Sequence, residues 1–327
     1  MFHCRIYQDK IAMKQKVSLV LSGGGARGIA HIGVIEELEK RGFEIVAVAG
    51  TSMGSLVGGI YALEKMPEFK NWLLSLDKKK IISMVDFTLS SQGLIKGDKV
   101  MTKIKDFIPD ANIESLRIPY AAVAADIINK KEVVFTKGSL YDAIRASIAI
   151  PTFFTPVKTS NGLLVDGGVL NNIPVSHAKR SRGDMLVVVN VNANVPVIKL
   201  PGSKKEKEER ASGYKSRMEE FHNQISKSDP KNKEEKIGYI HLLNKTITLM
   251  ISGTSQLLLE KFPPDIMINI SRDSCSTYDF FKAEEMIETG RIAAAQTLDD
   301  WMHNGRKKHK KSITSFFKIK KHSRILL

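Results

Sequence analysis

The sequence predicts an α/β protein in which parallel strands alternate with crossover helices. An apolar, β-branched run over 17–21 is followed by a glycine-rich segment and by helical spacing over 29–40. A second such run, over 44–49, is followed at once by helical spacing over 53–65. Two consecutive strand–helix units indicate parallel strands, because strands of that kind need a crossover connection. With 327 residues, of which 43% are hydrophobic, the chain can bury one large core.

The first two helices have recognisable ends. Ile32, Ile35 and Leu38 recur at spacing three in the first helix, and Gly42 stands just past its last turn. The second helix ends before Pro67. Further strands are predicted over 119–126, 132–135, 163–165, 185–191 and 265–270, and further helices over 141–150 and 281–302, the last with candidate caps at Ser276 and Thr277. Residues 68–110 predict helices plus a mobile cover over the site, and 237–259 predict a return of core structure.

Composition divides the chain into a leader, one large domain and a tail. Residues 1–15 form the leader, 16–302 the α/β domain, and 303–327 the tail. Within the domain, 202–236 holds ten basic and eight acidic residues and few apolar ones. We expect this segment to be a solvated insertion and not a second core.

The basic character of the chain is largely a property of its C-terminal end. The net charge is +15, but residues 301–327 hold nine Lys or Arg and no acid, and the remainder carries 41 basic against 35 acidic residues. The tail interleaves these cations with Phe and Leu, which suits peripheral contact with anionic lipid. A solvated tail is the alternative, and nucleic-acid contact is disfavoured.

Features of the chain ends and cysteines favour a cytoplasmic protein. The first sixteen residues lack the apolar core of a signal peptide, and no run of eighteen apolar residues occurs. Cys4 and Cys275 are far apart in sequence and suggest no disulfide framework. The tail adds the option of a peripheral position at the inner membrane surface. The oligomeric state is left open.

A serine between two glycines marks the predicted turn from the second strand to the second helix. Gly50, Ser52 and Gly54 form G-x-S-x-G, the pattern of a nucleophile elbow. Glycines suit this turn because a side chain at either position would strike the neighbouring strand or helix. The first amides of the following helix, beginning with Met53, lie where they favour negative charge.

The glycine-rich loop after the first strand admits two functions. Gly23, Gly24 and Gly25 begin a G-x-G-x-x-G pattern, which also occurs in dinucleotide-binding loops. The elbow on the adjacent unit favours an oxyanion hole instead, since both turns emerge at one sheet edge and face each other. Arg27 either orients this loop or adds positive charge near the oxyanion.

The base that activates the serine is a histidine or a carboxylate. His31 lies in the first predicted helix, His177 in a helix predicted after Pro174, and three more histidines belong to the tail region, so none has a triad-like setting. Asp166 stands at a strand end before two glycines, where burial would raise its proton affinity. Asp126 ends another strand and is interpreted as a turn or cap acid.

Together these motifs resemble the patatin-like phospholipase family. The glycine-rich loop with its arginine, G-x-S-x-G and Asp166-Gly-Gly occur in the family's order and spacing. Three further pieces are similar to family motifs: Ala146-Ser-Ile-Ala-Ile-Pro-Thr-Phe-Phe-Thr-Pro156, Ala124-Ala-Asp126 and Asn171-Asn-Ile-Pro174. The resemblance covers about 16–191, and more faintly the last strand and 280–302. It implies a three-layer α/β/α fold with a mainly parallel central sheet.

The resemblance also implies a Ser–Asp dyad with no histidine, metal or cofactor. Carried over by position, Ser52 is the nucleophile and Asp166 the base. The expected oxyanion hole comprises the glycine loop, Arg27 and Met53, with the amides of Gly24, Gly25 and Met53 as principal donors. The implied activity is hydrolysis of lipid acyl esters, of the phospholipase A or lysophospholipase type.

Two other functions remain open from the sequence. One is an α/β-hydrolase with a Ser–Asp–His triad, although that fold generally places several strands before the elbow and only one precedes it here. The other is a module that binds a nucleotide or a lipid without catalysis. The head group, acyl position and chain length of a lipid substrate are not predicted.

Overall fold

The fold places the elbow and the glycine loop at one edge of a mixed sheet. In this computed structural model the described residues are 15–83, 98–151, 154–200 and 239–322. Outside them lie residues 1–14 of the predicted leader and 84–97 of the segment over 68–110 that was predicted to hold helices and a mobile cover. The charged insertion over 202–236 and residues 323–327 of the tail lie outside them as well.

The described elements alternate between strands and helices in the first half of the chain. The strands are β1 (Gln15–Leu21), β2 (Phe43–Thr51), β3 (Tyr120–Asp126), β4 (Lys131–Phe135), β5 (Val157–Lys158), β6 (Leu163–Asp166), β7 (Met185–Ala193) and β8 (Ile266–Ser271). The α-helices are α1 (Ala30–Lys40), α2 (Met53–Ala62), α3 (Met66–Leu74), α4 (Lys78–Ser83), α5 (Asp98–Lys105), α6 (Leu140–Ser147), α8 (Tyr239–Lys261) and α9 (Ala283–His322). Short 3-10 turns are η1 (Gly25–Ile29), η2 (Ile113–Ser115), η3 (Gly167–Val169), η4 (Val175–His177) and η5 (Phe280–Lys282).

The strands form one sheet in the order β5-β6-β3-β2-β1-β7-β8, and β4 pairs with β3 off this path. The pairs β3–β2, β2–β1, β1–β7 and β7–β8 are parallel, whereas β4 and β6 run antiparallel to β3. The predicted mainly parallel sheet is therefore confirmed. Since β1 and β2 are parallel neighbours, the glycine loop and the elbow leave the sheet at the same edge.

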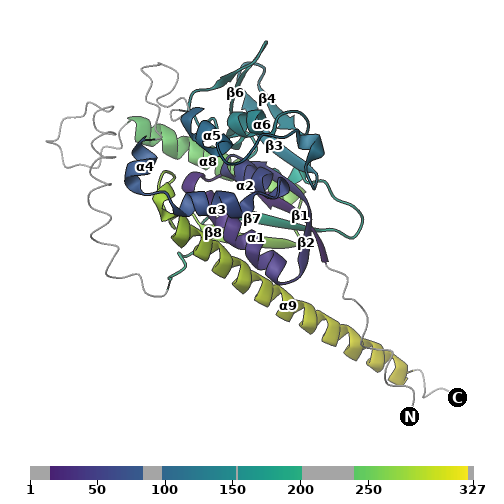
Figure 1. Cartoon of the computed structure of the whole chain (residues 1–327). Coiled ribbons are helices and arrows are strands. Elements are labelled where there is room, and N and C mark those ends of the chain that lie inside the picture. Colours follow the sequence, from purple (N-terminus) through teal and green to yellow (C-terminus); the bar gives the residue numbers. More distant parts are fainter. Residues whose placement is uncertain (1–14, 84–97, 152–153, 201–238, 323–327) are drawn as a thin grey trace.

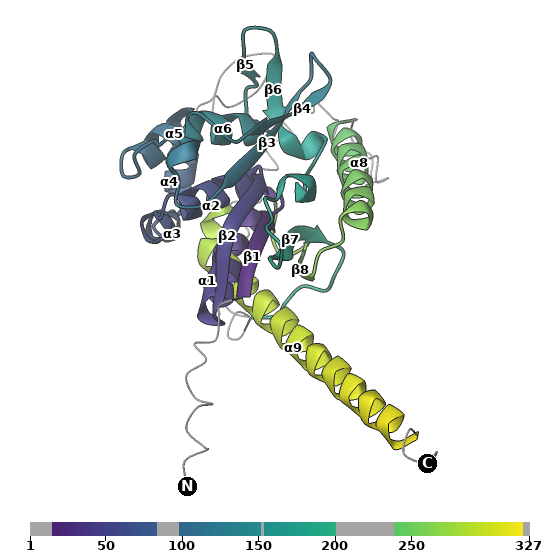
Figure 2. The same cartoon turned by 90° about the vertical axis from the view of Figure 1, so that its right-hand side faces the viewer.

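Helices cover both faces of the sheet, which gives three layers (Figures 1 and 2). Alternate residues of one strand enter different cores: Leu19 and Leu21 join the larger cluster, and Val20 joins the smaller one. The larger cluster lies under α1, α2 and α9, and the smaller one is covered by the end of α8. The site is thus carried by a sheet that is buried on both faces.

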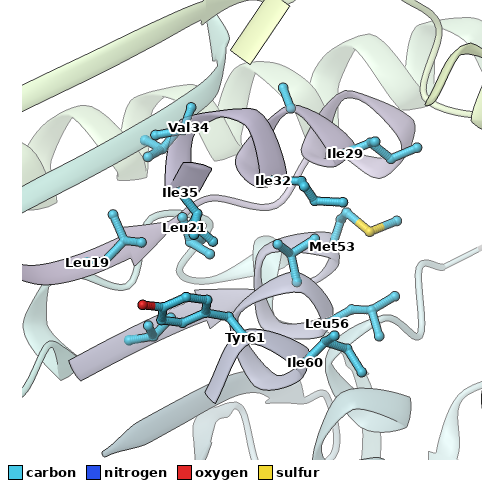
Figure 3. Close-up of a cluster of buried hydrophobic side chains, with 14 of the residues drawn as sticks. Leu19, Leu21, Ile29, Ile32, Val34, Ile35, Met53, Leu56, Ile60 and Tyr61 are labelled. Atoms are coloured by element: carbon cyan, nitrogen blue, oxygen red, sulfur yellow. The ribbon is translucent and has the colours of Figure 1, made fainter. Parts of the chain in front are cut away.

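The core beside the site joins the two helices that follow the glycine loop and the elbow. Figure 3 shows the apolar side chains of α1 and α2 meeting over β1, with Met53 beside Ile32. The packed residues in this view include Leu19, Leu21, Ile29, Ile32, Val34, Ile35, Met53, Leu56, Ile60 and Tyr61. Met53 therefore has its side chain in the core, while its amide stays in the first turn of α2.

The prediction of core structure over 237–259 is wrong for most of that segment. It forms the helix α8, and only part of one face is covered, with Leu258 and Leu259 against the smaller cluster. Leu249 and Met250 on its outer side are 73% and 65% exposed. An apolar composition cannot tell which face of a helix has a partner, and α8 is apolar on both.

Two helix ends also differ from the predictions. The helix predicted over 141–150 ends at Ser147 as α6, in keeping with the extended geometry favoured before Pro151. The predicted caps Ser276 and Thr277 do not begin α9, because the chain first forms η5 after Asp279. The helical backbone of α9 continues through the tail to His322.

Within the described residues, none of the helices has both the length and the hydropathy needed to cross a membrane.

Candidate active site

Ser52 occupies a strained backbone conformation between β2 and α2. Its φ is 54° and its ψ −127°, a region that residues with a side chain seldom adopt. A Cβ on Gly50 would strike the carbonyl of Gly54, and one on Gly54 would strike the carbonyl of Leu21. Both glycines of the motif are therefore required by close backbone approach, as an elbow demands.

Ser147, the last residue of α6, links the elbow to the neighbouring strand β3. The Ser52 amide donates to Ser147 Oγ at 2.9 Å, and Ser147 Oγ donates to the Val123 carbonyl at 2.6 Å. All three residues are buried. Ser147 lies in the Ala146–Pro156 motif already quoted, but nothing in one sequence links that serine to the elbow.

Asp166 lies at the end of β6, beside the elbow. Its amide donates to the Ala149 carbonyl at 2.9 Å, and its Oδ1 accepts the Gly168 amide at 2.7 Å. Gly167 is required here because a Cβ would strike the Val123 carbonyl. The two glycines after Asp166 thus let the chain turn tightly under β3 and return an N–H group to the carboxylate.

Burial dominates the electrostatics of Asp166. The residue is only 6% exposed, and desolvation raises the pKa of its carboxyl to about 6. Hydrogen bonds from the Ser52 hydroxyl and from the Gly168 amide oppose this shift without cancelling it. The structure therefore brings the alcohol and the carboxylate together, with the carboxyl pKa near neutrality.

The glycine loop presents backbone amides toward the elbow. Among the described residues, the amides of Gly24 and Gly25 have no protein acceptor, and Gly25 has φ +57°. The Met53 amide is in the first turn of α2, where helix N–H groups lack intrahelical acceptors. Gly23 is a correction among the expected donors, because its amide already donates to the Asn172 carbonyl at 3.0 Å. Its lack of a side chain lets Ser52 and Asn172 approach.

Arg27 anchors the glycine loop to the end of β7 and to the segment that follows β8. Its guanidinium donates to Asn192 Oδ1 at 2.9 Å, to the Cys275 carbonyl at 3.2 Å and to Thr277 Oγ1 at 3.3 Å. The loop amide of Ala26 also donates to the Thr277 carbonyl, at 2.8 Å. Of the two interpretations of Arg27, these contacts favour the orienting one.

Asn171 and Asn172 connect the Asp166 segment to both turns. Thr51 Oγ1, beside the elbow, donates to the Asn171 carbonyl at 2.8 Å, and the Asn172 carbonyl receives the Gly23 amide. Asn171 Nδ2 and His177 Nε2 both lie 2.9 Å from Glu132 Oε1. The sequence had shown this asparagine pair only as a family motif, without a contact to either turn.

The remaining polar candidates are engaged elsewhere. His31 is buried, its Nε2 lies 2.8 Å from the Ser22 carbonyl, and burial lowers its pKa to about 4. His177 faces Glu132, and the side chain of His241 lies outside the described part of the chain. Asp126 accepts N–H groups of Ile128, Asn129 and Leu163, which lower its pKa to about 2, as a turn acid requires.

The fold and this combination of turns define a class of protein. A family model described as patatin-like phospholipase matches residues 19–179. An uncharacterized NTE family protein of Mycobacterium tuberculosis is 31% identical over 334 aligned residues, covering 87% of this chain and 91% of that protein. The chain belongs to the patatin-like phospholipase family, and the membership supports lipid acyl hydrolase activity.

Two further similarities are more distant. Lysophospholipase NTE1 of Candida albicans is 27% identical over 312 residues, which are 92% of this chain but only 22% of that protein. The crystal structure of VipD from Legionella pneumophila matches with a TM-score of 0.44 and 16% identity, covering 88% of this chain and 67% of VipD.

Proposed function

We propose that this protein hydrolyses acyl esters of lipids with Ser52 as nucleophile and Asp166 as its base. The observation that carries the proposal is the interaction of the Ser52 hydroxyl with the buried carboxyl of Asp166, whose pKa burial raises to about 6. A serine hydroxyl needs a base within reach to become nucleophilic. At neutral pH a carboxyl with this pKa is mostly ionised and holds a proton better than an ordinary aspartate.

In the first half-reaction, Asp166 takes the hydroxyl proton while Ser52 Oγ bonds to the acyl carbon. The carbonyl electron pair moves to oxygen, and the amides of Gly24, Gly25 and Met53 are the donors we assign to that charge, since Gly24 and Gly25 lack a protein acceptor among the described residues. The intermediate then collapses, the alcohol leaves with the proton from Asp166, and an acyl-enzyme remains. In the second half, Asp166 takes a proton from water while the water oxygen bonds to the acyl carbon. The bond from that carbon to Ser52 Oγ then breaks, Asp166 returns the proton to Oγ, and the fatty acid leaves.

The lipid class follows from relatives and not from geometry. A Candida albicans relative is named a lysophospholipase, and a lysophospholipid is accordingly our first candidate substrate, with diacyl phospholipid as the second. Both present a carboxylic ester to the same dyad. Peripheral contact of the basic tail with a membrane remains a prediction, and so does the boundary of the catalytic domain at residue 302.

A fluorophosphonate probe tests the nucleophile directly. We expect it to label the wild-type protein and not Ser52→Ala, and Asp166→Asn to label at least about a hundredfold more slowly. Absence of labelling of folded wild type would favour a binding module without catalysis. His177→Ala is the matched test of a triad, and near-complete loss of esterase activity in that variant would favour the histidine mechanism.

A lipid panel then separates the substrates. Release of fatty acid from lysophospholipid, diacyl phospholipid, neutral lipid and acyl thioester is compared for wild type, Ser52→Ala and Asp166→Asn. We expect release from lysophospholipid to depend on both residues. Dependence on both with another lipid would correct the substrate and keep the mechanism.

A further inference from the structure

Large apolar side chains are exposed on three segments that flank the stretch carrying Asp166. Ile127 and Ile128, in the turn between β3 and β4, are 47% and 61% exposed. Leu170, just after η3, is 41% exposed. The outer side of α8 adds a longer stripe, which consists of Leu242, Leu249, Met250 and Leu257. We call these seven residues the rim surface.

Strand register places the β3–β4 turn close to the proposed catalytic residues. Thr51, the last residue of β2, is level with Val123 of β3, and β3 continues for three more residues past the elbow. On the same side of β3, directly beyond the end of β2, Asp166 of β6 is level with Ala124, and β4 occupies the other side. The turn at Ile127 and Ile128 therefore stands just beyond both proposed catalytic residues, at the edge where they lie.

The stripe on α8 belongs to a helix that contacts the segment after Asp166. Positions 242, 249, 250 and 257 fall within an arc of about 100° on a helix, so they share one face. The opposite face carries Leu258 and Leu259, which pack on the sheet. The helix also contacts η3 and η4, the turns that follow Asp166. The stripe is thus the outer side of the element that lies against the Asp166 segment.

Cations accompany the apolar residues at this end. Lys130 and Lys131 follow directly after the two isoleucines, and both are exposed, as is Lys158 on the β5–β6 hairpin. Asn129 Nδ2 donates to the Asn161 carbonyl at 2.9 Å, which holds the two hairpin tips together. A tip with apolar residues beside lysines is suited to the interface of an anionic bilayer.

We propose that the rim surface docks on an anionic lipid bilayer, with Lys130, Lys131 and Lys158 at the head groups. This inference rests on the proposed function, because a lipid substrate would then reach Ser52 from the surface on which the protein sits. The free end of α9 lies at the opposite end of the molecule from these hairpins (Figures 1 and 2). The helical part of the basic tail therefore lies away from the docking surface proposed here.

The test measures vesicle binding separately from catalysis. Full-length Ser52→Ala protein is titrated with phosphatidylcholine vesicles, with and without phosphatidylglycerol. We expect stronger binding to the anionic vesicles, and a partition coefficient about tenfold lower in Ile127→Asn/Ile128→Asn and in Leu249→Gln/Met250→Gln. Leu74→Gln is the matched control, since Leu74 on α3 is 44% exposed and lies outside the rim surface.

Activity on a soluble short-chain ester, measured in the Ser52 background, shows that each rim variant keeps its fold and site. Unchanged vesicle binding in both rim variants, or no binding by the parent, would overturn the docking proposal while leaving Ser52-dependent ester hydrolysis intact. If the parent protein self-associates without binding vesicles, and the same substitutions abolish that self-association, the rim surface is instead an interface with a second copy of the chain. If vesicle binding is lost only in the tail variant Lys307→Gln/Lys308→Gln/Lys310→Gln/Lys311→Gln, the tail and not the rim surface is the docking element.

Discussion

The backbone amide of Ser52 donates a hydrogen bond of 2.9 Å to the hydroxyl of Ser147, which lies 95 positions further along the chain. The same hydroxyl donates to the carbonyl of Val123. An elbow with φ 54° persists only where its surroundings hold it, and this bridge ties it to β3 and α6. The bridge also occupies the Ser52 amide, which leaves the amides of the glycine loop and of Met53 to face a developing oxyanion.

The first prediction concerns Ser147→Ala. The substitution leaves the buried Ser52 amide without an acceptor, which lowers the free energy of unfolding by about 1–3 kcal/mol. It also holds Ser52 Oγ less firmly in the position needed for attack. We expect kcat to fall about tenfold to a hundredfold with little change in KM, measured on a soluble ester. Ser18→Ala is the control, because Ser18 is equally buried and its hydroxyl donates to the Lys179 carbonyl away from the elbow. Equal losses in the two variants would mean a general packing effect.

Local patterns were enough to predict the parallel strands and both turns, whereas the candidate dyad followed from the family resemblance. The glycines at positions 50 and 54 and the apolar run before them specify the elbow, since few other residues fit such a turn. Ser147, Asn171 and Asn172 could not be assigned, because their contacts depend on which strands become neighbours. The hydrogen bond that occupies the Gly23 amide could not be predicted for the same reason, because its acceptor, Asn172, is 149 positions away.

The second prediction is a pH profile set by Asp166. Burial raises the pKa of this carboxyl to about 6, and the proposed mechanism requires its ionised form. We expect kcat/KM on a soluble ester to fall about tenfold per pH unit below pH 6 and to level off above pH 7. The apparent pKa of a carboxyl changes little with temperature, whereas that of an imidazole falls on warming. A profile that shifts markedly with temperature would therefore contradict a carboxylate base.

The third prediction compares two glycine substitutions. A Cβ at Gly54 would strike the backbone of Leu21 and Ser22, neither of which can rotate away. We expect Gly54→Ala to lower the free energy of unfolding by about 3 kcal/mol or more, or to prevent folding. Gly253 on α8 has nothing within 4 Å of such a Cβ, so Gly253→Ala should be neutral or stabilising by up to about 1 kcal/mol. Chemical denaturation measures both, and equal effects would contradict the crowding argument.

The last prediction separates a structural histidine from a catalytic one. Burial of His31 lowers its pKa from 6.5 to about 4, so the folded protein resists protonation there while the unfolded chain does not. The stability from the neutral imidazole is full above pH 6.5 and is lost as the pH falls toward 4. In wild type this loss should reach roughly 2 kcal/mol by pH 5.

His31→Gln removes the titrating group and keeps a donor for the Ser22 carbonyl. Chemical denaturation at pH 7 and pH 5 should therefore show a smaller acid loss in this variant than in wild type. Its kcat at pH 7 should stay within a few fold of wild type, because the proposed proton transfer runs through Asp166. If the free energy of unfolding of this variant falls between pH 7 and pH 5 as much as that of wild type, His31 is not the buried neutral imidazole inferred here. If the variant folds normally yet loses nearly all activity, His31 is the base.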